Sequence, residues 1–265
     1  MEAIKEFFGV GGYTREPEGF LSWQHLLFVT VFILIMIGLS VFLGLRNKEK
    51  DEKVKNKVVA WAAVILLFLK VLEMVVACLI AHSVKQLLYL LPLFLCSMQM
   101  IALPLAAFSK GRIKEAALDF VFIFGILGAV MGTYGAGQNF SCYPILSFDN
   151  VLSVLTHTLS GFASLYIAIS GMTSMKGRNI WITFTILLVF CVLAYIADIL
   201  IPYNYMFLMR GDGTPYDIFY NLVNGNKILY PLIVVFLFLL YLSLFYFVYF
   251  LVRRHKAKKA AAPTK

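Results

Sequence analysis

Seven apolar stretches, each about 20 residues long, constrain this chain more than any other feature of its sequence. A spanning helix needs roughly 20 mostly apolar residues, because each residue advances about 1.5 Å through a hydrocarbon core about 30 Å thick. Membrane strands would be about half as long and would alternate in polarity. The stretches are residues 21–45, 58–81, 86–108, 117–135, 151–173, 180–202 and 228–251. The sequence therefore predicts an all-α fold, a polytopic membrane helical bundle with seven transmembrane helices.

The composition favours the same fold class and leaves little chain for anything else. Apolar residues make up 61% of the 265 residues and charged residues 14%, against roughly 25% charged residues in an ordinary soluble domain. A soluble protein of this size could not bury that much apolar surface. We expect an extracytoplasmic N-terminal segment over residues 1–20, one transmembrane domain over residues 21–252 and a basic cytoplasmic tail over residues 253–265.

Basic residues gather in alternate loops, and this pattern predicts the orientation. Cytoplasmic loops are enriched in Lys and Arg. Seventeen of the 23 basic residues fall in the loops after the first, third and fifth stretches and in the tail, whereas five fall on the opposite side and Lys70 lies within a stretch. The N-terminus is therefore expected outside and the C-terminus in the cytoplasm of a multi-pass protein of the cell membrane. The net charge of +9 is explained by these loops, so no nucleic-acid partner is expected.

Polar side chains inside the apolar stretches are the best indicators of function, because a charged group in hydrocarbon costs about 3 kcal/mol or more. Lys70 and Glu73 lie in the middle of the second stretch at positions i and i+3, where they share a helical face. One interpretation is an ion pair that only orients the helix. The other is that Glu73 orients or tunes another polar group in a pocket.

A cysteine and a histidine suggest covalent chemistry in the outer half of the bilayer. From the outer ends of their stretches, Cys96 would lie about 15 Å deep, His157 about 9 Å and Glu73 about 12 Å. A Cys–His pair provides a nucleophile and a base, because the imidazole can remove the thiol proton before the thiolate attacks an acyl carbon. Gln99, on the face of Cys96, Glu73 and Asn204 are candidates for a third group that holds the imidazole. A lone buried cysteine is more often simple packing, so depth does not decide between these interpretations.

The other polar residues are interpreted as structural or interfacial rather than catalytic. His25 and Asp119 lie near the ends of their stretches and are expected at the interface, solvated by headgroups and water. Cys78 and Cys142 fall on the outer side and are able to form a disulfide in an oxidising compartment. The histidines and carboxylates are too scattered to predict a metal site, and no cofactor is expected. The last stretch contains no lysine, which argues against a retinal-binding pump.

Three segments together resemble the YwaF-like family of bacterial integral membrane proteins. LPLFLC, at Leu91–Cys96, is similar to that family's LPLHLC motif; LTHTLSG, at Leu155–Gly161, falls where the family has a span with one histidine; and NYMFL, at Asn204–Leu208, is similar to the segment after its sixth span. The resemblance covers about residues 20–250. The family has a vertebrate branch that resembles a membrane ether-phospholipid acyltransferase. The resemblance implies Cys96 as nucleophile and His157 as base, with Asn204 and the adjacent Tyr205 near the cavity mouth.

The sequence therefore favours a membrane-embedded lipid acyltransferase or acyl hydrolase that acts on phospholipid or lysophospholipid through Cys96 and His157. The alternative is a lipid-binding or transport protein in which Lys70, Glu73 and His157 form a polar pocket without covalent catalysis. A structural or regulatory subunit is a third hypothesis. One departure bears on the choice, because Phe94 stands where the LPLHLC motif has a histidine.

Overall fold

The computed structural model describes residues 1–173 and 175–261, and every regular element in these ranges is a helix. Five helices are long and apolar enough to cross a membrane, namely Trp23–Asn47, Glu52–Ile80, Phe148–Ile169, Gly177–Leu200 and Leu229–His255. They coincide with the first, second, fifth, sixth and seventh predicted stretches. The chain divides into two compact units, residues 1–174 and 175–265, which we describe separately.

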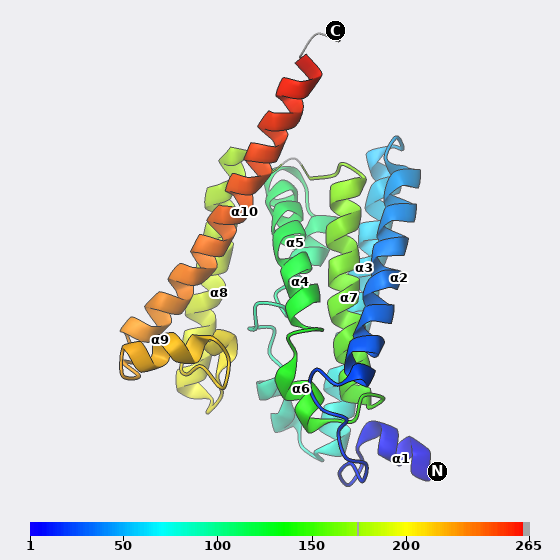
Figure 1. Cartoon of the computed structure of the whole chain (residues 1–265), viewed down its shortest axis with the longest axis vertical. Coiled ribbons are helices and arrows are strands. Elements are labelled where there is room, and N and C mark those ends of the chain that lie inside the picture. The colour runs from blue at the N-terminus through cyan, green and yellow to red at the C-terminus, as the bar shows by residue number, and fades with distance from the viewer. Residues whose placement is uncertain (174, 262–265) are drawn as a thin grey trace. The chain divides into compact units, whose positions relative to one another are not determined.

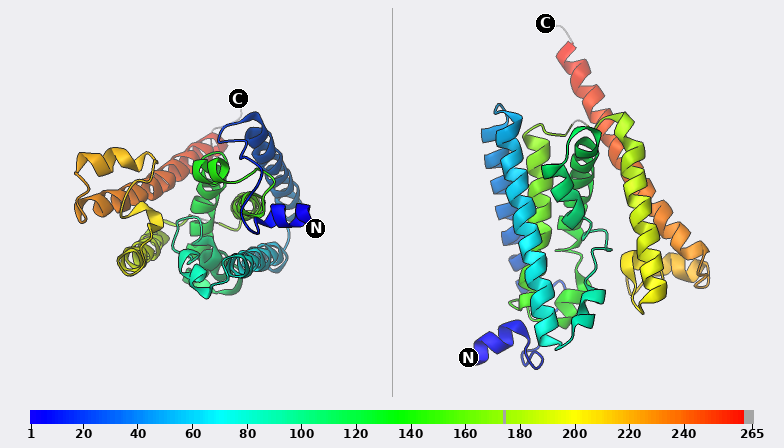
Figure 2. Two further views of the ribbon diagram at one scale, coloured as in Figure 1. Left: turned by 90° about the horizontal axis from the view of Figure 1, so that it is seen from below. Right: turned by 180° about the vertical axis from the view of Figure 1, so that it is seen from behind.

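The first unit is a bundle of upright helices (Figures 1 and 2). Its elements are α1 (Glu2–Phe8), α2 (Trp23–Asn47), α3 (Glu52–Ile80), η1 (Val84–Tyr89), α4 (Gln99–Phe108), α5 (Gly111–Met131), α6 (Gly137–Cys142) and α7 (Phe148–Ile169). Helix α7 is central, because it packs against α2, α3 and α5, and 50% of its apolar window is buried against 17% for α2 and 11% for α3. Side chains carried by α7 therefore face protein more than lipid.

The third predicted stretch, residues 86–108, is not one helix. It consists of the short 3₁₀ helix η1, an irregular segment over residues 90–98, and the ten-residue α4. Pro92 lies in the irregular segment; proline lacks the N–H that a helix needs and disfavours helical geometry at the preceding residue. The break places non-helical backbone next to buried helices, an arrangement that membrane proteins tolerate where the segment is enclosed by protein or lines a cavity.

The fourth predicted stretch, residues 117–135, also differs from the structure. Helix α5 begins at Gly111 and ends at Met131, so its first turns include the charged residues around Arg112. Those charges keep α5 out of the set of purely apolar spans. Asp119 is 1% exposed and accepts a hydrogen bond from the Thr173 hydroxyl at 2.5 Å. The prediction that Asp119 is solvated at an interface is therefore wrong.

His25 is a second correction, since it is fully buried at the start of α2. Its Nδ1 accepts a hydrogen bond from the Leu21 N–H at 3.1 Å, and its Nε2 lies 3.2 Å from the carbonyl oxygen of Thr133. The ring also packs on Phe140, with the centroids 3.9 Å apart. A ring that accepts at Nδ1 and donates at Nε2 is a satisfied, neutral core imidazole, so the sequence-based placement of His25 in headgroups and water is wrong.

The second unit consists of η2 (Gly177–Asn179), α8 (Ile180–Leu200), η3 (Tyr205–Phe207), α9 (Tyr216–Leu222) and α10 (Leu229–Ala261). Helices α8 and α10 are its two long apolar elements and contact each other. The hydroxyl groups of Thr183 and Tyr246 lie 3.2 Å apart between them. All four cysteines are free thiols in this structure, including Cys78 and Cys142, for which the sequence left a disulfide open.

Candidate active site

Cys96 lies in the irregular segment immediately before α4. Among the described residues, the backbone N–H groups of Cys96 and Ser97 donate to no backbone carbonyl. The segment owes this shape to the break at Pro92, because a continuous helix would direct these N–H groups to carbonyls one turn earlier. Cys96 is half-buried and lies three residues before the first residue of α4.

His157 projects from the middle of α7 against the glycines of α5. A methyl group at Gly132 would lie 2.2 Å from both Nδ1 and Cε1 of His157, so the ring occupies the space that a side chain would take. The imidazole is also within hydrogen-bonding reach of the Gly128 backbone. Since that backbone group acts as an acceptor, one ring nitrogen carries the proton and the other is left to accept one.

The cysteine and the histidine both lie close to Gly128. A methyl group at this glycine would lie 3.8 Å from Cβ of Cys96 and 3.9 Å from Nδ1 of His157. Two atoms within 4 Å of one point belong to side chains that lie on the same glycine. Catalytic hydrogen bonds are often long before substrate binds, so this placement is compatible with a nucleophile and a base.

Lys70 and Glu73 of α3 form an ion pair with each other. Their side chains are 15% and 29% exposed. Oε2 of Glu73 is buried, and the Lys70 ammonium is its ion-pair partner.

Gln99 opens α4, three residues after Cys96, and is 2% exposed. Neither its Oε1 nor its Nε2 has a hydrogen-bond partner. A buried amide without partners costs free energy that native proteins rarely accept. Packing alone therefore does not account for the burial of the Gln99 amide without partners.

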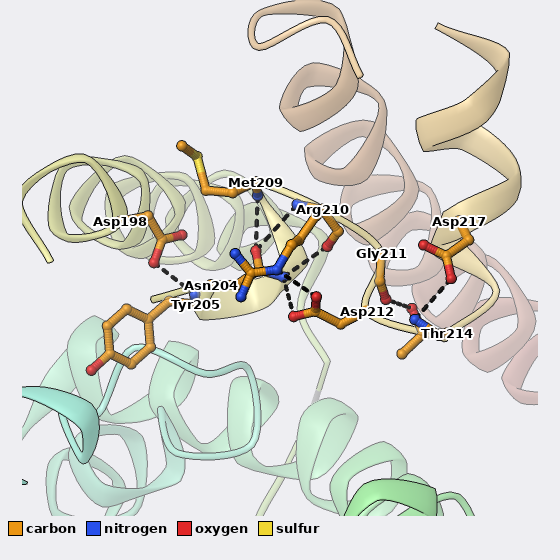
Figure 3. Close-up of polar contacts among 10 residues, drawn as sticks. Asp198, Asn204, Tyr205, Met209, Arg210, Gly211, Asp212, Thr214 and Asp217 are labelled. Atoms are coloured by element: carbon orange, nitrogen blue, oxygen red, sulfur yellow. Dashed lines mark hydrogen bonds and ion pairs between the residues drawn. The ribbon is translucent and has the colours of Figure 1, made fainter. Parts of the chain in front are cut away.

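Asn204 and Tyr205, the two remaining predicted site residues, belong to the second unit. The Asn204 amide is fully engaged within its own loop (Figure 3). Its Nδ2 donates to the Arg210 carbonyl and to Oδ2 of Asp212, both at 2.8 Å, and its Oδ1 accepts from the N–H groups of Met209 at 2.9 Å and Arg210 at 3.4 Å. This bonding makes Asn204 the organiser of the loop.

The backbone of Tyr205 anchors that loop to α8, because its N–H donates to Oδ1 of Asp198 at 2.7 Å (Figure 3). Met206 and Phe207 follow with positive φ angles of 53° and 58°, a conformation that non-glycine residues adopt only when their surroundings hold them. The NYMFL segment is thus a tight, strained turn with its polar groups paired.

Sequence reasoning missed Gly128, Gly132 and Ser97. The two glycines form a GxxxG pattern within GAVMG, the pattern with which membrane helices approach each other closely, and that signal was available. Ser97 gave no signal because its role depends on where the helix breaks. Among the described residues, no group of three or more His, Cys, Asp or Glu side chains is placed to hold a metal ion.

Comparisons with known proteins point to one family. The model of the TMEM164 family matches residues 20–249. No curated protein and no solved structure matches the chain. The family match covers all of the site residues described above.

Proposed function

This chain belongs to the TMEM164 family, and on that premise we propose that it is a membrane-embedded lipid acyltransferase or acyl hydrolase with Cys96 as nucleophile and His157 as base. The observation that carries the proposal is the approach of Cβ of Cys96 and Nδ1 of His157 to the same point at Gly128. The proposed substrates are a phospholipid acyl donor and, as acceptor, a lysophospholipid or water.

The reaction divides into two acyl transfers. His157 takes the thiol proton, and the Cys96 sulfur attacks the ester carbonyl; the C–S bond forms, the C–O bond breaks, and His157 returns the proton to the leaving lysophospholipid oxygen. In the second transfer the acceptor hydroxyl loses its proton to His157 and attacks the thioester, and the sulfur leaves as a thiolate that His157 reprotonates. The Gly128 carbonyl supports both steps because it fixes one imidazole tautomer, the task that a carboxylate performs in other triads.

The acyl-enzyme provides the direct test. The purified protein is incubated with phospholipid and measured by intact mass spectrometry beside Cys96→Ala and Cys191→Ala; Cys191 is a buried cysteine of α8 and a matched control. We expect an added mass of one acyl group, released by hydroxylamine, in the wild type and in Cys191→Ala but not in Cys96→Ala. An adduct that persists in Cys96→Ala excludes Cys96 as the nucleophile.

A second candidate function is lipid binding or transport without covalent chemistry. It is favoured by the partly buried Lys70–Glu73 ion pair of α3, a polar group of the kind that binds headgroups, and by Phe94 at the histidine position of the LPLHLC motif. Phospholipid exchange between vesicles separates the two functions, because Cys96→Ala should retain transport and lose acyl transfer.

We also propose seven crossings of the cell membrane, with the N-terminus outside and the C-terminus in the cytoplasm. The third crossing would consist of η1, the irregular segment and α4, and the fourth of α5. The basic loops support this topology. In intact cells, a membrane-impermeant maleimide should label the exposed Cys142 and leave a cysteine introduced at Lys50 unlabelled until the cells are opened. The reverse labelling would invert the orientation.

A further inference from the structure

Helix α4 begins beside the candidate nucleophile with backbone donors that the chain does not use. In the part of the chain that the structure describes, the first backbone bonds around this turn run from Met98 N–H to the Phe94 carbonyl and from Gln99 N–H to the Cys96 carbonyl. The N–H groups of Cys96 and Ser97 have no backbone carbonyl acceptor in this part of the chain. The N-terminus of a helix carries a partial positive charge and favours an anion.

The Gln99 side chain is the second, independent observation at the same turn. It is 2% exposed, and both of its polar atoms lack partners. Lys70 is not a partner for the Gln99 amide, since the Lys70 ammonium is paired with Glu73. The turn therefore combines directed N–H donors with a buried carboxamide that has an unused N–H₂ group, three residues from the sulfur that would attack an acyl carbon.

We propose that the first turn of α4 is an oxyanion site, in which the Ser97 N–H and the Gln99 carboxamide bind the carbonyl oxygen of the acyl ester. This assignment rests on the proposed function and deepens it. When the Cys96 sulfur adds to the carbonyl carbon, the C–S bond forms and the C=O electron pair moves onto oxygen. When the tetrahedral intermediate collapses, that pair re-forms C=O and the ester oxygen leaves with the proton from His157. The donors stabilise the charge between these two events.

If the unpaired Gln99 amide binds the oxyanion, it should lower the stability of the protein without substrate and raise the rate of acyl transfer. Gln99→Met keeps the length and the unbranched shape of the side chain and removes its polar atoms. Met98→Leu is the matched control, because Met98 lies in the same turn, is 1% exposed and has no polar group to offer. Three quantities are measured on the full chain in detergent: the rate of acyl-thioester formation, the rate of Cys96 alkylation by iodoacetamide followed by peptide mass spectrometry, and the melting temperature.

For Gln99→Met we expect acyl-thioester formation to slow by about 100-fold, alkylation to stay within about threefold, and the melting temperature to rise. Iodoacetamide reacts by displacement and builds no charge on a carbonyl oxygen, so it reports thiol access and reactivity alone. Met98→Leu should leave all three quantities near their wild-type values.

Two outcomes would overturn the oxyanion assignment while leaving the acyl-enzyme in place. One is a Gln99→Met protein that acylates within threefold of the wild type. The other is a variant in which acylation and alkylation fall together, because Gln99 would then be a positioning residue for Cys96. A wild-type protein that alkylates at Cys96 and yet forms no thioester would instead remove the proposed function, and the oxyanion site with it.

Discussion

The site at the start of α4 and the loop that follows α8 treat their side-chain amides in opposite ways. Gln99 is buried with no partner for either polar atom, whereas Asn204 makes four hydrogen bonds within its own loop. Polar groups with all their hydrogen bonds made hold a backbone in place. Buried polar groups without partners are rare in native proteins and suggest that a ligand supplies the partner. The difference indicates a structural role for Asn204 and supports the proposed binding role of the turn around Cys96.

The same contrast appears between two glycines that have no room for a side chain. A methyl group at Gly132 would lie 2.2 Å from Nδ1 of His157, and one at Gly211 would lie 2.1 Å from Oδ1 of Asp217. In the first unit the glycine leaves space for a candidate base. In the second it leaves space for a carboxylate that accepts from the Gly213 N–H at 2.8 Å and closes a turn.

The largest effect is expected for Gly132→Ala. The added methyl must displace the His157 ring, and a shift of about 1 Å at a reacting group can cost about 100-fold in rate. We expect acyl-thioester formation to fall by at least that factor, measured by intact mass spectrometry. Gly128→Ala is the matched control, because its methyl meets Cys96 and His157 at ordinary contact distances of 3.8 and 3.9 Å; it should lose less than about tenfold. Equal losses in the two variants would contradict the role given to Gly132.

Removing the saturated amide should act on stability rather than on chemistry. Asn204→Ala deletes four hydrogen bonds, each worth about 1 kcal/mol net, and leaves groups of the loop without partners. We expect a loss of about 2–4 kcal/mol in the free energy of unfolding, read from the thermal transition of the purified protein. Gln99→Met is expected to shift the same transition upward. Shifts of the same sign would break the comparison between the two amides.

A smaller loss is expected for Gly211→Ala, of about 1–3 kcal/mol. Its methyl would also crowd the Asp217 N–H, at 2.5 Å, and so would open the turn between residues 211 and 217. Limited proteolysis should cut this loop faster in the variant, while acyl-thioester formation per folded molecule stays within about threefold of the wild-type rate. Loss of the thioester at unchanged proteolysis would transfer catalytic importance to the second unit.

The sequence indicated how far along an apolar stretch each residue lies, but not which side chains or backbone groups it contacts. Five apolar stretches predicted the long helices, whereas the pairing of Cys96 with His157 stays a prediction, with both residues close to Gly128. The third stretch failed because hydropathy does not register a break inside an apolar run, although Pro92 marked it. His25 and Asp119 failed because nearness to a span end was taken for exposure, whereas their partners Thr133 and Thr173 lie far along the chain. Gln99 was found as a candidate, but its lack of partners is a property of the fold.

The smallest effect is expected outside the two regions, in the N-terminal segment, where pH provides the test. Hydrogen bonds from the Arg15 N–H and from the hydroxyl and N–H of Thr14 lower the pKa of the Glu6 carboxyl. A carboxyl whose pKa is lower in the folded chain stabilises the fold above its unfolded pKa, and that contribution disappears as the pH falls through the folded value. We expect amide hydrogen exchange at Thr14 and Arg15 to accelerate in acid relative to neighbouring segments, and Glu6→Gln to remove the difference. Because Glu6 is exposed, the change should stay local and leave hydrogen exchange of the amides in α4 and in the Asn204 loop unaltered. Faster exchange in acid in either region would mean that the contrast between Gln99 and Asn204 depends on pH and not on hydrogen-bond saturation.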